Sequence, residues 1–159
     1  MNKLWAPWRI NYIRNIKQKG CVFCKGKGKD SKACVIFETD YARVMLNIFP
    51  YNNGHILVAP VRHVARLDQL KQKEVLGLFA ALTKSQKLLD KVLKPNGYNI
   101  GINLSRSAGA GITGHLHIHI VPRWIGDTNF MPVLFGTKVI SQSLDELRKQ
   151  LKNAYAKTN

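Results

Sequence analysis

Long apolar runs are absent from this sequence of 159 residues. No stretch approaches the roughly 18 to 20 apolar residues that cross a membrane, and the opening MNKLWAPWRI has no apolar run long enough for a signal-peptide core. Cysteine is scarce as well, and the three cysteines suit a reducing compartment. We therefore expect a cytoplasmic protein without a membrane segment.

Acidic residues are also few. Nine Asp and Glu stand against 25 Lys and Arg, which gives a net charge of +16 at pH 7. A field of that sign concentrates phosphates near the surface, so we expect an anionic partner. The charge alone does not distinguish a nucleic acid from a nucleotide or an acidic lipid.

Length and composition indicate a single domain. A chain of 159 residues with 45% apolar residues can build one core, so we expect one domain over residues 1–159. Residues 15–32 are rich in Lys and Gly and are predicted to form a loop within an N-terminal arm over residues 1–34.

Two helices are predicted from apolar spacing and end signals. Apolar residues between Leu67 and Leu93 recur at three- and four-residue spacing, and Pro95-Asn-Gly97 stops the pattern, which predicts the main helix. Ser143-Leu-Asp-Glu146 is a capping box, so a C-terminal helix is expected within residues 140–159.

The remaining segments favour strands. β-branched and aromatic residues around a turn predict a hairpin over residues 35–49, and residues 55–61 form a third strand. Residues 98–105 and 115–123 are expected as strands around a loop whose glycines let the backbone approach a ligand closely. About five strands, one long helix and a terminal helix indicate an antiparallel sheet covered on one face, an α+β fold.

The histidines are concentrated in two short segments. Three of the five, His115, His117 and His119, occupy every second position of GHLHIHIVPRW. On a strand their side chains project from one face about 6.8 Å apart, so the three rings span about 14 Å, and the residues between them face the core. A single histidine there is usually solvated, but three of five beside a glycine-rich loop indicate a site.

Imidazole chemistry suggests that these rings divide several roles. Near pH 7 imidazole serves as a nucleophile, a proton carrier or a metal ligand. One ion cannot bind all three, because Zn–N bonds are about 2.1 Å and the outer rings are some 14 Å apart. One ring of the three can still be a metal ligand.

Two motifs resemble the histidine triad (HIT) nucleotide-binding superfamily. HLHIHIV is similar to its His-x-His-x-His-x-x signature. Upstream, Asn47, Pro50 and the segment Gly54-His55-Ile-Leu-Val-Ala-Pro60 resemble its nucleoside-binding hairpin. The resemblance covers residues 21–124 and implies the HIT-like fold.

The resemblance also implies roles for individual residues. His117 would attack the α-phosphate of a nucleotide and form a nucleotidyl-histidine intermediate. His119 would bind phosphate oxygens where charge builds up, with Thr113 and the N–H groups of the glycine-rich loop as further donors. Asn47 would hold the ribose hydroxyls. The nucleotide-binding candidates are Asn47, His55, Asn103, Ser105, Gly109, Gly111, Ile112, His119 and Trp124.

Two of these candidates have a second interpretation. His55 lies where the family has a histidine close to the triad, yet a hydrogen-bonded structural histidine explains it equally well. Trp124 is either a wall near the substrate or a core or interface aromatic.

A metal site is predicted around Cys21-Val-Phe-Cys24. A zinc site needs four N or S ligands, and His63 and His115 are the candidates to complete it. The resemblance implies the same set, since zinc-containing members and galactose-1-phosphate uridylyltransferases take ligands from matching positions. Such a closed, structural zinc would tie the N-terminal loop to the catalytic strand. The alternative is two reduced thiols without a metal.

One feature separates the chain from the hydrolase and phosphoramidase branches of the family. Those branches usually carry Gln-Ser or Gln-Thr four and three residues ahead of the first triad histidine, where this chain has Gly111 and Ile112. Losing that hydroxyl removes a proton donor to the leaving group, for which Thr113 is a possible substitute. The strings LWAPWR, AGAGITGHLHIHIVPRW and GDTNFMPV resemble instead a bacterial branch of diadenosine tetraphosphate phosphorylases.

The leading hypothesis is an enzyme that cleaves a dinucleoside polyphosphate at the α-phosphate, with phosphate or water as acceptor. Three alternatives stay open: a purine nucleoside phosphoramidase or AMP-lysine hydrolase, a zinc-stabilised RNA-binding module, and a nucleotide sensor. Nucleic acid is the less expected partner, because no clustered aromatics on a sheet face suggest base stacking. Family resemblance further suggests a homodimer formed through the sheet edge and the main helix.

Overall fold

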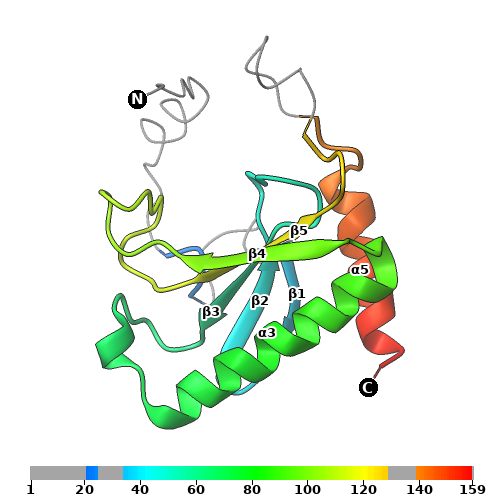
Figure 1. The fold of residues 1–159 in the computed structure, drawn as a ribbon. Coiled ribbons are helices and arrows are strands. Elements are labelled where there is room, and N and C mark those ends of the chain that lie inside the picture. The colour runs from blue at the N-terminus through cyan, green and yellow to red at the C-terminus, as the bar shows by residue number, and fades with distance from the viewer. Residues whose placement is uncertain (1–20, 25–33, 129–138, 159) are drawn as a thin grey trace.

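The computed structural model describes residues 21–24, 34–128 and 139–158. These residues form one antiparallel sheet of five strands in the order β1-β2-β3-β5-β4, and two α-helices with a short 3₁₀ helix (Figure 1). The predicted α+β class is therefore confirmed. The elements are β1 (Val35–Glu38), β2 (Ala42–Leu46), β3 (Ile56–Pro60), η1 (Leu67–Gln69), α3 (Gln72–Leu93), β4 (Gly97–Ile102), β5 (Ile118–Arg123) and α5 (Leu144–Ala156).

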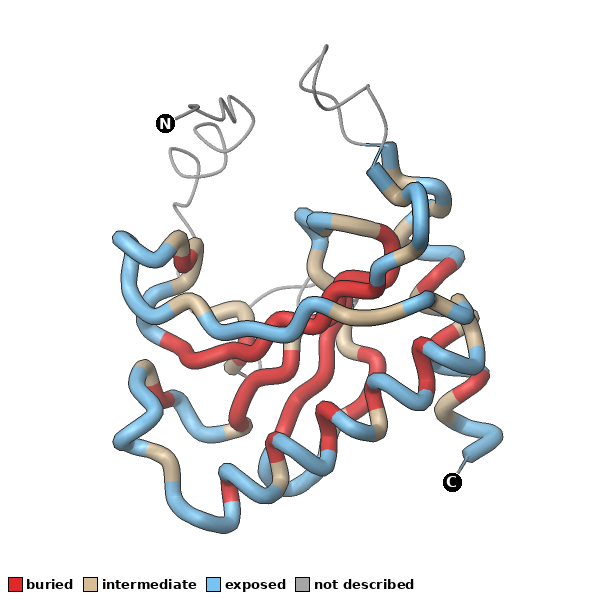
Figure 2. Tube along the Cα trace, viewed as in Figure 1, coloured by how far each residue is buried: buried red, intermediate tan, exposed pale blue. Residues whose placement is uncertain are grey.

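Both helices lie on the same face of the sheet (Figure 1). Helix α3 packs against β2, β3 and β5, while α5 packs against β1 and α3. Apolar residues at helical spacing form the contact, because they bring one side of each helix to the sheet. Figure 2 shows this buried layer between helices and strands. Its largest fully buried members are Ile56, Leu78, Leu89, Ile120, Leu147 and Leu151.

The main helix ends as predicted but begins five residues after the predicted Leu67, and the last helix has its predicted cap. The main helix begins at Gln72, after the 3₁₀ turn, and Lys94 ends it in the left-handed region with φ 49°. The Ser143 side chain accepts a hydrogen bond from the Glu146 N–H, so the predicted cap of α5 is present. Among the described residues, no helix is long and apolar enough to span a membrane. Most of the predicted N-terminal arm lies outside the described residues.

A close turn between β2 and β3 places the segment that precedes His55. Gly54 has φ +75°, which favours glycine. A Cβ at this position would lie 2.5 Å from Leu93 Cδ1 and 3.0 Å from Pro122 Cγ. Glycine therefore lets the turn sit against both the end of α3 and the end of β5.

The strand predicted over residues 115–123 begins later, at Ile118. Pairing of β3 with β5 stops at Val58↔Ile118, and the next position on β3 toward β5 is Pro60. Proline has no N–H to donate to Leu116. The Leu116 N–H donates instead to the Val64 carbonyl at 2.6 Å. His115 and His117 thus lie just before the strand rather than within it.

The strand predicted over residues 98–105 also ends earlier, at Ile102. Ile102 pairs with Ile118, which is the first residue of β5. Beyond this pair β5 no longer offers a partner, so the chain leaves the sheet and enters the glycine-rich loop.

Candidate active site

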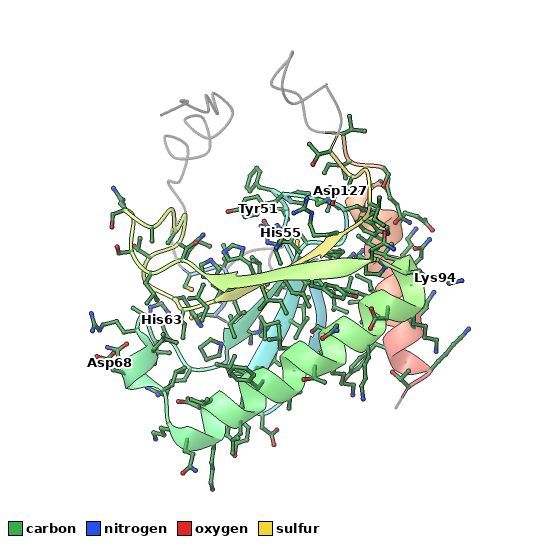
Figure 3. All side chains as sticks on the ribbon, viewed as in Figure 1. Tyr51, His55, His63, Asp68, Lys94 and Asp127 are labelled. Carbon is green, nitrogen blue, oxygen red and sulfur yellow. The ribbon has the colours of Figure 1, made fainter. Side chains whose placement is uncertain are left out.

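The triad histidines gather on the face of the sheet that the helices do not cover. On β5, Ile118 and Ile120 belong to the core beneath α3, so His119 between them faces the opposite side. All three triad histidines are buried, with His117 5% and His119 9% exposed. Figure 3 shows Tyr51 and His55 on this side of the sheet and His63 toward its other end.

The turn before β3 determines which nitrogen of His55 carries a hydrogen. The Tyr51 backbone N–H donates to His55 Nδ1 at 3.0 Å, and Asn47 Nδ2 lies 3.2 Å from the same atom. In a neutral ring the hydrogen then sits on Nε2. His55 Nε2 is 2.9 Å from His119 Nδ1 and therefore donates to it. His119 in turn carries its own hydrogen on Nε2.

The Nε2–H group of His119 is a buried donor in need of an acceptor. Among the described residues it has no hydrogen-bond partner. Burial, reinforced by neighbouring His117, lowers the pKa of His119 to about 4, so the ring is neutral at pH 7. An unsatisfied buried donor destabilises a protein by about 1–3 kcal/mol. A ligand oxygen placed here would remove that cost.

His117 has the opposite arrangement. Its Nδ1 lies 2.8 Å from the His115 carbonyl oxygen, which can only accept, so Nδ1 donates. Its Nε2 therefore has a lone pair and no hydrogen. Burial lowers the pKa of His117 below its usual range, although the hydrogen bond to the carbonyl opposes this. A neutral ring with an available lone pair can act as a nucleophile.

The four predicted metal ligands converge. The ligand atoms of Cys21, Cys24, His63 and His115 all lie within 4.8 Å of one another. Cys21 Sγ is 3.2 Å from His115 Nδ1, and Cys24 Sγ is 3.2 Å from His63 Nδ1. His115 Nε2 donates to the Pro60 carbonyl at 2.8 Å, so its Nδ1 lone pair is directed to the cluster. Two sulfurs and two imidazole nitrogens form a common donor set for tetrahedral zinc.

Burial affects the ionisation of this cluster. It lowers the pKa of His115 to about 4, against the opposing effect of the Pro60 hydrogen bond. It also raises the pKa of the Cys24 thiol, with a further contribution from hydrogen bonding to Cys21. The imidazole is therefore available as a neutral ligand, and an ion that binds here would release thiol protons.

Aromatic rings form an unbroken row from the β2–β3 turn to the cysteines. Neighbouring ring centroids along this ring row lie 4.6 to 5.1 Å apart. Tyr51 also stacks on His119, with an interplanar angle of 11°. The row contains Tyr51, His55, His119, His117, Phe23, His115 and His63.

Two of the other predicted residues lie next to this row, Asn47 beside His55 and Ile112 against the cluster that contains Phe23. Asn47 is oriented by the Phe49 N–H, which donates to its Oδ1 at 2.9 Å. Ile112 packs against the cluster of Phe23, Met45 and Ala59. The loop that holds Gly109 and Gly111 is closed by the Ala110 N–H, which donates to the Ser105 carbonyl.

The structure does not connect every candidate to the triad. Thr113 and Ser105 are exposed, while Asn103 and Trp124 are half-buried. Within residues 97–128, no hydrogen bond joins any of these four to a triad histidine. Their predicted roles therefore depend on the family resemblance.

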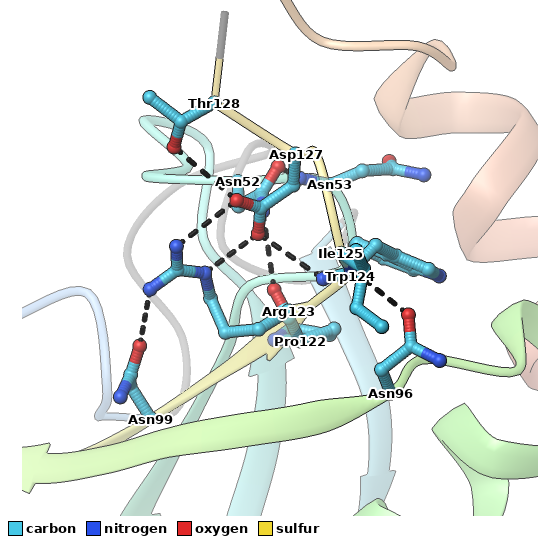
Figure 4. A network of polar contacts seen from close by, with 10 residues as sticks. All are labelled: Asn52, Asn53, Asn96, Asn99, Pro122, Arg123, Trp124, Ile125, Asp127 and Thr128. Atoms are coloured by element: carbon cyan, nitrogen blue, oxygen red, sulfur yellow. Dashed lines mark hydrogen bonds and ion pairs between the residues drawn. The ribbon is translucent and has the colours of Figure 1, made fainter.

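A polar network lies at the β2–β3 turn, next to Tyr51 in the sequence (Figure 4). Asp127 accepts from Arg123 Nε at 2.6 Å and from Asn52 Nδ2 at 2.8 Å. These contacts join the segment after β5 to the β2–β3 turn. A pocket of about 240 Å³ lies beside the network, lined by Tyr51, Asn52, Asn99, Val121 and Arg123. A second pocket, of about 400 Å³, lies at the N-terminal end of α3 and contains none of the predicted site residues.

Sequence reasoning missed two residues at the centre of the site. Phe23 is fully buried and stacks on His117, although the sequence places it in a loop of Lys and Gly. The sequence feature that could have revealed Phe23 is a large apolar residue between two cysteines. Tyr51 is exposed, yet its ring stacks on His119 and lies tilted against His55. The sequence feature that could have revealed it is an aromatic residue in a turn that precedes a histidine.

Known proteins resemble this chain over most of its length. A family profile described as HIT domain matches residues 28–124. An AP-4-A phosphorylase of Mycobacterium tuberculosis is 34% identical, over 99% of this chain and 86% of that one. An asymmetrical bis(5'-nucleosyl)-tetraphosphatase of Schizosaccharomyces pombe is 37% identical, over 56% of this chain and 48% of that one. A zinc-bound histidine triad family protein from Mycobacterium smegmatis has a TM-score of 0.63 and 27% identity, and covers 78% of this chain and 84% of its own.

Proposed function

The chain belongs to the HIT domain family, and we propose on that premise that it cleaves dinucleoside polyphosphates at an α-phosphate with His117 as the nucleophile. One observation carries the proposal: hydrogen bonds leave a lone pair on His117 Nε2 beside an N–H on His119 that has no acceptor in the described part of the chain. A nucleophile next to an oxyanion donor is the arrangement that covalent phosphoryl transfer requires. The similarity to a phosphorylase and a tetraphosphatase supports the choice of substrate.

In the first step, the Nε2 lone pair of His117 forms a bond to the α-phosphorus. The P–O bond to the rest of the polyphosphate breaks, and the leaving phosphate takes the electron pair. His119 Nε2–H donates to a non-bridging oxygen as negative charge builds up there. The net charge of +16 favours approach of such an anion.

In the second step, an oxygen of the acceptor attacks the same phosphorus. The P–N bond breaks, His117 recovers its lone pair, and the acceptor releases its proton. Inorganic phosphate would yield ADP and water would yield AMP. We propose phosphate as the acceptor, because the phosphorylase from M. tuberculosis matches nearly the whole chain.

The nucleoside would lie across the β2–β3 turn. One N–H of the Asn47 amide faces His55, so the other is the donor for a ribose hydroxyl. The pocket beside Tyr51 offers space on the same face of the sheet. Contacts from Asn103, Ser105, Gly109, Gly111, Ile112 and Trp124, and the donor role of Thr113, belong to this proposal.

Cys21, Cys24, His63 and His115 would hold zinc. A bound ion in such a closed site supplies a structural anchor and not a bond to the substrate. The four side chains would fix the Cys21–Cys24 turn to the segment that carries His117. Reduced cysteines in this role suit the cytoplasm, where we place the protein.

A product assay tests the proposed reaction. The protein is incubated with diadenosine tetraphosphate, with and without inorganic phosphate, and the nucleotides are separated. With radiolabelled phosphate we expect equal ADP and ATP, with the label in ADP, because AMP is transferred and ATP leaves. AMP and ATP in both arms would make water the acceptor. Two ADP without ATP, or tight RNA binding without turnover, would contradict the proposal.

We also propose that two copies associate through the edge of the sheet. Among the described residues strand β4 pairs with β5 alone, so its outer edge offers backbone groups that a second chain can bind. On β4 Ile100 is 48% exposed, and on α3 Phe79 is 61% exposed. Ile100→Lys should therefore convert a dimer into a monomer in size-exclusion chromatography with light scattering. Ile125→Lys, on an exposed loop, is the matched control, and a monomeric wild-type protein would rule the dimer out.

A further inference from the structure

We propose that Phe23 is a positioning residue that transmits metal binding at the cysteines to the ring of His117. The inference rests on the proposed role of His117 as the nucleophile. It assigns a function to a side chain that is neither a triad histidine nor a metal ligand. Three observations carry the inference: the burial of Phe23, its stacking on His117, and its position in the sequence between Cys21 and Cys24.

Phe23 is held firmly among the described residues. It is fully buried and packs with Met45 and Ala59 on the triad face of the sheet. Its carbonyl accepts a hydrogen bond from Arg43 Nη1, and Arg43 Nε donates to Glu38 at 2.8 Å. The ring therefore has a defined place and forms a fixed surface for its neighbours.

Stacking on that surface sets the plane of the His117 ring. The ring centroids are 4.9 Å apart and the interplanar angle is 30°. The hydrogen bond from His117 Nδ1 to the His115 carbonyl fixes one atom of the imidazole but leaves rotation about that bond. Phe23 on one side and His119 at 5.0 Å remove this freedom. The direction of the Nε2 lone pair, and so its alignment with the phosphorus, depends on both neighbours.

The same residue is joined to the metal site through the backbone. The Cys24 N–H donates to the Cys21 carbonyl at 3.1 Å, which closes a turn with Phe23 inside it. The cysteine side chains meet His63 and His115 from two other parts of the chain. An ion bound by all four would lock this turn against the segment before β5. Removal of the ion would then loosen Phe23 and allow the His117 ring to turn.

An NMR experiment tests this link without measuring turnover. Histidine ring resonances are recorded for the wild-type protein after chelation and after zinc is added back. Because Phe23 shields the His117 ring, zinc should shift the His117 ring protons, and Phe23→Leu should remove most of this shift. The resonances of His63 and His115 should respond to zinc in both proteins. A His117 response that is the same in both would overturn the proposal.

A kinetic experiment on the zinc-loaded protein tests what Phe23 contributes to the reaction rate. Phe23→Leu keeps an apolar side chain but loses the flat ring face, so kcat should fall about 10- to 100-fold with little change in KM. Phe37→Leu is the matched control, because Phe37 is also buried and stacked, on Tyr155 at 4.4 Å, but lies in the core. It should lower the Tm and leave kcat within about threefold. Zinc content and circular dichroism are measured for each variant.

The outcomes separate this inference from the proposed function. Wild-type kcat in zinc-loaded Phe23→Leu would overturn the inference and leave the function intact. If Phe23→Leu does not fold or does not bind zinc, the His117 ring resonances of the wild-type protein are compared with and without zinc. Resonances that zinc does not shift would contradict the link. If the wild-type protein cleaves no dinucleoside polyphosphate, the proposed function fails, while the NMR link between metal and His117 is judged separately.

Discussion

Replacing His117 with alanine should abolish cleavage of diadenosine tetraphosphate, with kcat reduced by at least about 10⁴-fold. The reason is specific to this ring. Its Nδ1 is engaged by the His115 carbonyl, so Nε2 is the only nitrogen that can attack phosphorus. The wild-type protein, quenched during turnover, should carry a covalent AMP group on residue 117 in intact-mass and peptide spectra. The variant should carry none.

His117→Gln distinguishes chemistry from packing. Glutamine fills part of the space beside Phe23 but offers no comparable nucleophile. Both variants should still bind zinc and AMP, measured by metal analysis and calorimetry, because Asn47, His55 and the cysteines are unchanged. Turnover near the wild-type rate in either variant, without a trapped adenylyl group, would refute the role of His117.

Replacing Cys24 with serine should remove zinc and lower the Tm by about 10 °C or more. The expected size follows from the binding free energy of structural zinc, because each kcal/mol of lost stability lowers the Tm of a chain this long by about 2–4 °C. The loss should be large because four ligands from three separate segments meet at this point. Chelation of the wild-type protein should reproduce the shift, and added zinc should reverse it only in the wild-type protein.

Cys34→Ser is the matched control for this prediction. Cys34 is half-buried and does not belong to the four-residue cluster. It should keep zinc at the wild-type level and lose little stability. Equal zinc content and equal Tm in Cys24→Ser and the wild-type protein would show that the cluster does not bind the ion.

Much of the site could be predicted because residue type and spacing restrict it. Alternation along residues 115–119 placed three imidazoles on one face, and the pair Cys21 and Cys24 required two further ligands. The structure brings His63 and His115 to that pair. The α+β class followed from strands that alternate and one long amphipathic helix.

The rest depended on long-range contacts that local pattern does not contain. Strand β5 starts at Ile118 because Pro60, 58 positions earlier, cannot donate to it. The hydrogen positions on His55 and His119 depend on a backbone amide in a turn far from the triad. Phe23 could not be assigned to His117 because the two residues lie 94 positions apart and no local pattern links the cysteine segment to the triad.

The ring row has a consequence for how this protein can evolve. Each inner ring has ring neighbours on both sides, so a substitution of different size leaves a gap or a clash at two contacts at once. Energetic effects of touching residues do not add, which makes single changes costly and compensated pairs tolerable. We therefore expect lineages that descend from this sequence to alter adjacent rings together, while isolated replacements within the row are eliminated by selection.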